Sequence, residues 1–183
     1  MNASTSNGTF KFSLPAQSEW EATATPNGGS GDKALAVVAT TVGGRITAGN
    51  KFTVKDQPVS IVLTVSEATQ RVEGFVRKNG KGFAGAMIVL VPRSAAGTPK
   101  SSMPGRAFPE LARRDQSDSD GSFSLRDVAP GPYIVVAIED AWELDWARPE
   151  VISRYLSGGI AVTVSGSSGK IVEVSQPVPV QSR

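Results

Sequence analysis

The chain contains no cysteine and no histidine among its 183 residues. Without cysteine no disulfide can form, so the hydrophobic core alone has to stabilise the fold. Without histidine the chain cannot by itself supply a histidine-based zinc site, a Ser-His-Asp triad or a Cys-His pair. We therefore expect a protein that is not an enzyme, with no catalytic residues, no metal site and no cofactor.

An excess of charge of one sign is also missing. The 19 basic and 17 acidic residues give a formal net charge of +2, and neither sign forms a long block. This balance argues against a nucleic-acid partner, whose phosphates require a basic surface. No apolar run approaches the ~20 residues of a membrane-spanning helix, so we expect no membrane insertion by this segment.

The chain is rich in turn-forming residues, with 19 Gly and 12 Pro, and 39% of it is hydrophobic. This composition is typical of a globular all-β protein with short strands. It also contains an internal repeat, because Asn7–Phe12 is echoed by Asp120–Leu125. Trp20 follows Phe10 by ten residues and Tyr133 follows Phe123 by ten, so each aromatic residue opens a second strand.

The ends of the two repeat copies correspond as well. Phe52–Val54 and Ser60–Leu63 match Val162–Val164 and Lys170–Glu173, whereas the stretch from 70 to 119 has no counterpart in the first copy. We therefore divide the chain into a partial β-sandwich unit, 1–66, and a complete domain, 67–183. The partial unit is either the back half of a domain truncated from a longer parent protein, or a reduced small sheet that packs on its neighbour. Both explanations predict an unpaired sheet edge near the N-terminus.

The second unit shows three clear local patterns. Arg71–Arg77 alternates polar and apolar residues up to an Asn-Gly turn, which predicts a strand and a hairpin. Ala86–Val91 is a continuous apolar run, typical of a buried central strand. Pro149–Ser157 carries apolar residues at helical spacing and stops at two glycines, so one short helix is expected near 149–157. The expected strands are 70–77, 86–91, 115–119, 121–125, 132–139, 160–165 and 170–176.

These elements predict a seven-stranded antiparallel Greek-key sandwich preceded by the partial unit. Its expected core residues are Val72, Phe75, Ile88, Leu90, Phe123, Tyr133, Val135 and Ile171. The first unit is expected to form strands at 10–14, 20–25, 35–41 and 60–65. If its front strands are missing, it should expose some of five apolar residues, Phe10, Phe12, Trp20, Val37 and Ile61.

Four segments in order resemble carboxypeptidase regulatory-like domains, a prealbumin-like family with an Ig-like β-sandwich. They are Val72–Val76, Gly80–Pro92, Ser117–Phe123 and Val128–Tyr133. The resemblance covers 70–177, with Phe83 in place of the usual Pro-Val stretch and Ser117 in place of Thr. It implies a module of a large exported bacterial protein, located extracellularly, at the cell surface or in the periplasm. In carboxypeptidases the zinc site belongs to a separate catalytic domain, which this chain does not resemble.

The acidic segment after residue 138 offers the best candidate site. Its ligand-binding residues would be Trp142, Trp146, Tyr155, Glu143 and Asp145. Asp115, Asp118 and Asp120 fit a turn between strands better than a calcium loop, because the later Glu of the EF-hand is missing.

Two function classes remain open. The chain is a non-catalytic interaction or spacer module whose partners are other domains of its parent protein and a protein ligand, or it is a carbohydrate-binding module for a polysaccharide. Two exposed, coplanar aromatic rings would favour sugar binding, and buried rings would favour the scaffold role.

Overall fold

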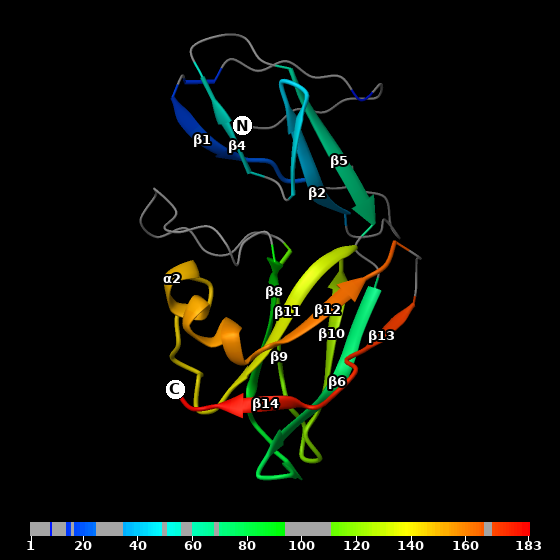
Figure 1. Ribbon diagram of the computed structural model, residues 1–183, viewed down its shortest axis with the longest axis vertical. Helices are drawn as coiled ribbons and strands as arrows, with labels where there is room; N and C mark the ends of the chain where they lie inside the picture. Colours follow the sequence, from blue (N-terminus) through cyan, green and yellow to red (C-terminus); the bar gives the residue numbers. More distant parts are fainter. Residues whose placement is uncertain are drawn as a thin grey trace, which may run out of the picture.

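The computed structural model describes residues 8, 14–15, 17–24, 35–48, 51–55, 60–67, 70–93, 111–166 and 170–183. These residues form β-strands and one short helical segment, in a sandwich-like arrangement (Figure 1). The strands are β1 Ser18–Glu21, β2 Leu35–Val42, β3 Arg45–Ala48, β4 Lys51–Val54, β5 Ile61–Glu67, β6 Gln70–Lys78, β7 Lys81–Gly82, β8 Met87–Pro92, β9 Arg113–Gln116, β10 Ser122–Val128, β11 Gly131–Ile138, β12 Ile160–Val164, β13 Ile171–Glu173 and β14 Val178–Gln181. The helical segment is α2 Pro149–Ile152, continued by the 3₁₀ helix η1 Ser153–Gly158. The all-β prediction with a short helix near 149–157 is confirmed.

The N-terminal strands form two small sheets. β1 pairs antiparallel with β4, and β2 lies between β3 and β5. The predicted strands at 35–41 and 60–65 match β2 and β5, and the strand predicted at 20–25 begins earlier, at Ser18. Residues 10–13 of the strand predicted at 10–14 lie outside the described residues, and so do Phe10 and Phe12.

The exposure predicted for some of five apolar N-terminal residues is tested at three of them. Val37 is fully buried, whereas Trp20 and Ile61 are half-buried. Ala36 and Val38, the neighbours of Val37 in β2, join the core of the C-terminal strands. The large exposed apolar side chains of this region are Ile46, Val62 and Val65.

One strand pair in each repeat copy has the same register. In the first copy Trp20 lies opposite Phe52, and in the second Tyr133 lies opposite Val162, both in antiparallel pairs. The copies differ in their last strand, because β5 pairs antiparallel with β2 whereas β13 pairs parallel with β6. The boundary at 66/67 and the truncation of the first unit stay predictions.

The strands β6 to β14 form what we call the C-terminal sandwich. One sheet contains β9, β8, β11 and β12, the other contains β10, β6 and β13, and β14 connects them by pairing with both β11 and β6. Figure 1 shows β14 crossing the lower end of the sandwich. The predicted fully antiparallel arrangement is therefore wrong in one respect, since β13 and β14 run parallel to β6. After β12 the chain crosses from one sheet to the other. Its next strand, β13, therefore lies beside β6 and runs in the same direction as β6.

The core between the two sheets includes six of the eight predicted residues. Val72, Ile88, Leu90, Phe123, Tyr133 and Val135 are all buried. The ring of Phe123 fits because it lies opposite a glycine, and a Cβ added at Gly74 would stand only 2.8 Å from its Cζ atom. Gly74 therefore makes room for the Phe123 ring in the core.

Phe75 and Ile171 were predicted in the core and are instead 52% and 54% exposed. Phe75 lies three residues after Val72, and in a strand residues at odd separations point to opposite faces. Val72 and Val76 point inward, so Phe75 points outward. The same alternation turns Val172 toward the core and Ile171 away from it.

A second apolar cluster covers the outer face of β8 and β11. Met87, Val89 and Val91 of β8 pack there with Val136, Ile138, Ala141 and Ile152. Every residue of β8 is buried, because its alternate side chains enter this cluster and the core between the sheets. The helical segment and the loop before it form a third layer on this sheet.

Tyr133 fixes the turn that leads into β11. Its hydroxyl donates a hydrogen bond to the carbonyl oxygen of Ala129 at 2.9 Å, as in the tyrosine corner of Ig-like sandwiches. Burial raises the pKa of Tyr133 to about 12, although the charge of Arg113 opposes this shift. The phenol therefore stays protonated and keeps its bond to the turn.

Phe83 and Ser117, which depart from the carboxypeptidase regulatory-like pattern, lie close together. The buried hydroxyl of Ser117 donates to the carbonyl oxygen of Phe83 at 2.7 Å and accepts from the backbone N–H of Ala86 at 2.9 Å. A threonine hydroxyl could make the same two bonds, so the serine preserves the link between β9 and the start of β8.

Candidate functional site

The predicted site lies in the loop 139–148, between β11 and α2, which we call the acidic loop. Backbone hydrogen bonds shape it, from the N–H of Leu144 to the oxygen of Ala141 at 3.0 Å and from that of Trp146 to the oxygen of Leu144 at 2.7 Å. Ala141 and Leu144 belong to the second apolar cluster. The loop therefore packs onto the sheet through its apolar residues.

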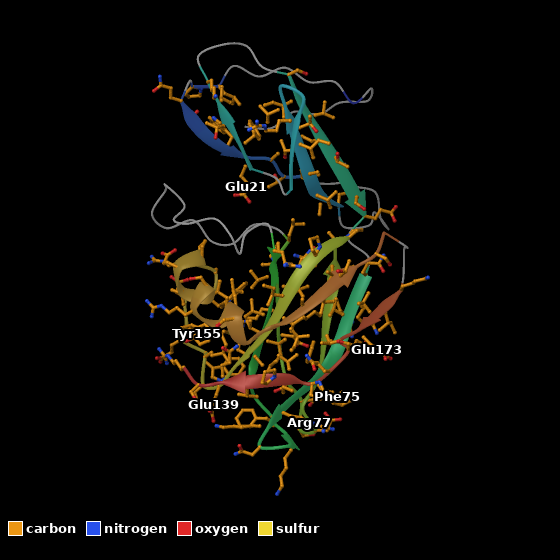
Figure 2. All side chains as sticks on the ribbon, viewed as in Figure 1. Glu21, Phe75, Arg77, Glu139, Tyr155 and Glu173 are labelled. Atoms are coloured by element: carbon orange, nitrogen blue, oxygen red, sulfur yellow. The ribbon has the colours of Figure 1, made fainter. Side chains whose placement is uncertain are left out.

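The three predicted aromatic residues do not share one exposed surface. Trp142 is 52% exposed, whereas Trp146 and Tyr155 are half-buried and pack against the second cluster. The guanidinium carbon of Arg114 lies 5.9 Å from the centroid of the Trp146 ring, a cation–π contact that covers this ring further. Figure 2 shows Tyr155 beside the helical segment, where its backbone oxygen accepts a hydrogen bond from Gln181 at 2.9 Å.

The two predicted site carboxylates pair with different arginines. Glu143 lies 3.8 Å from Arg183, and Asp145 lies 2.8 Å from Arg148. Both acidic side chains are more than half exposed, so each pair contributes little to stability. The two carboxylates therefore have separate ion-pair partners on an exposed surface.

A third carboxylate of the loop is better protected. Glu139 forms an ion pair with Lys78, and the Lys78 ammonium nitrogen lies 5.3 Å from the centroid of the Phe83 ring. The backbone N–H of Glu139 donates to the oxygen of Gln181 at 2.9 Å. These contacts tie the start of the acidic loop to the β6–β7 hairpin and to β14.

The aspartates before and within the turn at 118–121 bond to backbone groups. Asp115 accepts from the N–H of Ser124 at 2.8 Å, Asp118 from that of Ser119 at 3.2 Å and Asp120 from that of Ser122 at 2.9 Å. Hydrogen bonds from Ser122 lower the pKa of Asp120 below its ordinary value. No group of three or more acidic residues that could hold a metal ion occurs within the described residues.

The sequence analysis missed one surface, the outer face of the sheet β10–β6–β13, which we call the open face. It carries Arg71, Glu73, Phe75 and Arg77 of β6, Ser122 and Ser124 of β10, and Ile171 and Glu173 of β13. Figure 2 labels Phe75 and Arg77 beside the lower part of β6 and Glu173 beside β13. The alternation of Arg71–Arg77 already implied this face, because a strand that buries Val72 and Val76 must direct Phe75 outward.

Glu73 is the most strongly held side chain of the open face. It accepts a hydrogen bond from the Ser124 hydroxyl at 3.2 Å and forms an ion pair with Arg71 at 3.3 Å. Phe75 lies next along β6, opposite Ser122 of β10, and Arg77 follows it. A ring is therefore placed between an acidic and a basic side chain on one strand.

No protein-family model and no curated protein matches the chain. Among solved structures, it is similar to a Pseudomonas aeruginosa protein described as a candidate carbohydrate-binding protein, with 16% identity and a TM-score of 0.31 over 63% of this chain and 88% of that one. It is also similar to BcpA, the major pilin subunit of Bacillus cereus, with 14% identity and a TM-score of 0.33 over 85% of this chain and 40% of that one. The chain thus spans less than half of the pilin subunit, and neither likeness informs its function. In the described part of the chain, no helix is long and apolar enough to cross a membrane.

Proposed function

We propose that this chain is a non-catalytic β-sandwich module that serves as an interaction or spacer element in an exported or cell-surface multidomain bacterial protein. One observation carries the proposal. The acidic loop, which holds the best cluster of carboxylates and tryptophans in the sequence, packs Trp146 onto the second apolar cluster and pairs its site carboxylates with separate arginines. The loop covers the outer face of β8 and β11.

Hydrolysis by two carboxyl groups requires an acid and a base that face one substrate bond. Glu143 and Asp145 lie on an exposed surface, each beside its own arginine. This arrangement supports a non-catalytic role for both carboxylates. The partners that fit such a module are other domains of the parent protein and a protein ligand.

Carbohydrate binding is the second candidate, because the Trp142 ring is half exposed and aromatic faces stack on sugars. Trp146 and Tyr155, which would extend the platform, pack against the helical segment and the sheet. One exposed ring supports only a weak contact, so we favour the interaction or spacer module.

Affinity gel electrophoresis in soluble polysaccharides, together with turnover of chromogenic peptides and glycosides, tests the proposal. We expect no turnover and no retardation that depends on Trp142. The matched variants are Trp142→Ala for the exposed ring and Glu143→Gln and Asp145→Asn for the carboxylates. Retardation lost in Trp142→Ala would establish carbohydrate binding instead, and turnover lost in Glu143→Gln or Asp145→Asn would establish an enzyme.

A further inference from the structure

We infer that the open face is a self-association surface, on which a second copy of this chain binds. The open faces of the two copies pack against each other, with β6 of one copy antiparallel to β6 of the other. The inference specifies the partner of the proposed interaction module and rests on that function. It starts from the exposure of Phe75 and Ile171, which place two large apolar side chains on a sheet face that no described element covers.

The order of charges along β6 selects the partner. Glu73 lies two residues before Phe75 and Arg77 two residues after it, so each stands about 7 Å from the ring along the strand. Around the ring the pattern is thus acid, ring, base, and Arg71, two residues before Glu73 on the same face, is paired with Glu73. A surface with this pattern is complementary to itself when the second copy runs in the opposite direction.

Only one of the two simple face-to-face arrangements satisfies these charges. A two-fold axis in the plane of the interface and parallel to β6 would oppose Glu73 to Glu73 and Arg77 to Arg77. An axis perpendicular to β6, passing at Phe75, stacks the two rings and opposes each Glu73 to Arg77 of the other copy. The contact is then isologous, as two-fold interfaces require.

The neighbouring strand reinforces this arrangement. Glu173 of β13 lies beside Glu73 in the sheet, so the arriving arginine meets two carboxylates. Glu73 is oriented by Arg71 and Ser124 before any partner binds, which lowers the ordering cost of the contact. Ser122, opposite Phe75, is small enough to leave the ring free to stack.

The extent of the face determines the strength of the dimer. A face of three strands, one of them only three residues long, presents less than the roughly 800 Å² per partner of a standard protein interface. The dimer is therefore weak in dilute solution and gains from any arrangement that holds many copies close together, because linked copies raise the effective concentration. Salt weakens it, since its polar contacts lie at the exposed rim.

Sedimentation velocity of the full chain over a wide concentration range measures the association. The wild type should dimerise reversibly and more weakly at high salt. Phe75→Thr should weaken the dimer about tenfold or more, because it removes the stacked rings and leaves the polar contacts in place. The charge reversals Arg77→Glu and Glu73→Arg should each weaken it by a similar factor, because like charges then face each other. Circular dichroism and thermal melting establish that each variant is folded.

Mixing the two charge-reversed variants gives the sharpest test. In a pair of one Arg77→Glu chain and one Glu73→Arg chain, both contacts are again between opposite charges, so the mixture should associate more tightly than either variant alone. A wild type that is monomeric at every concentration, dimers indifferent to Phe75→Thr, or a mixture that stays monomeric would each overturn the inference. A monomeric wild type whose binding to a soluble polysaccharide is lost in Phe75→Thr would overturn it by assigning the open face to sugar. The proposed function fails separately, through turnover that depends on Glu143 or Asp145 or polysaccharide binding that depends on Trp142.

Discussion

The two outer faces of the C-terminal sandwich differ in what covers them. The outer face of β8 and β11 carries Met87, Val89 and Val136, and the helical segment and the acidic loop bury it. The outer face of β6 carries Glu73, Phe75 and Arg77, and no described element packs on it. The same sandwich therefore combines an internal layer on one side with an accessible surface on the other.

The difference shows how the sequence pattern encodes coverage. A strand that is apolar at every position, as β8 is, requires a layer on both faces, whereas an alternating strand such as β6 requires only one. Phe75 and Ile171 depart from the polar pattern of the open face, and such departures are where a binding function is expected. The contrast can be tested by comparing matched substitutions on the core and on each outer face.

The largest effect is expected in the core between the sheets. Phe123→Ala should lower the free energy of unfolding by ~3 to 5 kcal/mol, because it removes a buried ring that packs over Gly74. Urea denaturation measures it, with Ser122→Ala on the outer face of the same strand as a control expected to cost less than ~1 kcal/mol. A cost below ~1 kcal/mol for Phe123→Ala would contradict the core assignment.

The covered outer face should respond almost as strongly. Ile152 of α2 is fully buried in the second cluster, so Ile152→Ala should cost about 2 to 4 kcal/mol. The control is Ile171→Ala on the open face, where a change within about 0.5 kcal/mol is expected. Equal costs for the two variants would show that the helical segment is not a packed layer.

The third effect depends on pH. Because burial raises the pKa of Tyr133 to about 12, above about 10 for an unfolded tyrosine, the group favours folding fully below pH 10. This contribution is lost as the pH rises from about 10 to about 12, and its size is on the order of 2 to 3 kcal/mol. Urea melts across this range should show a steeper loss for the wild type than for Tyr133→Phe, which cannot ionise. Parallel losses in both proteins would contradict the buried phenol.

The smallest effect is expected on the open face. Phe75→Thr replaces an exposed ring by a residue that suits a strand, so monomer stability should change by no more than about 0.5 kcal/mol. Measuring this at the lowest workable protein concentration keeps association from contributing. A loss above ~2 kcal/mol would mean that Phe75 packs within its own chain, and the contrast between the two outer faces would fail.

Much of the architecture followed from local patterns. The strand alternation at Arg71–Arg77, the apolar run at Ala86–Val91 and the helical spacing at Pro149–Ser157 predicted β6, β8 and the helical segment near their observed bounds. None of the expected strands covers β3, β4, β7 or β14, because each of them is only two to four residues long and β14 also contains a proline, which argues against a strand. That the candidate site is functional stays a prediction, and its three aromatic side chains do not share one exposed surface.

The sequence by itself determined the all-β class, the positions of most strands and the absence of histidine and cysteine chemistry, since these depend on residue type and on periods of two or 3.6 residues. The tertiary structure decided which rings are exposed and how the last strands run. Trp146 and Tyr155 are covered because the helical segment folds onto β8 and β11, and β13 and β14 lie parallel to β6 because the chain crosses between sheets. Both outcomes depend on contacts between segments distant in the chain, which a local pattern does not contain.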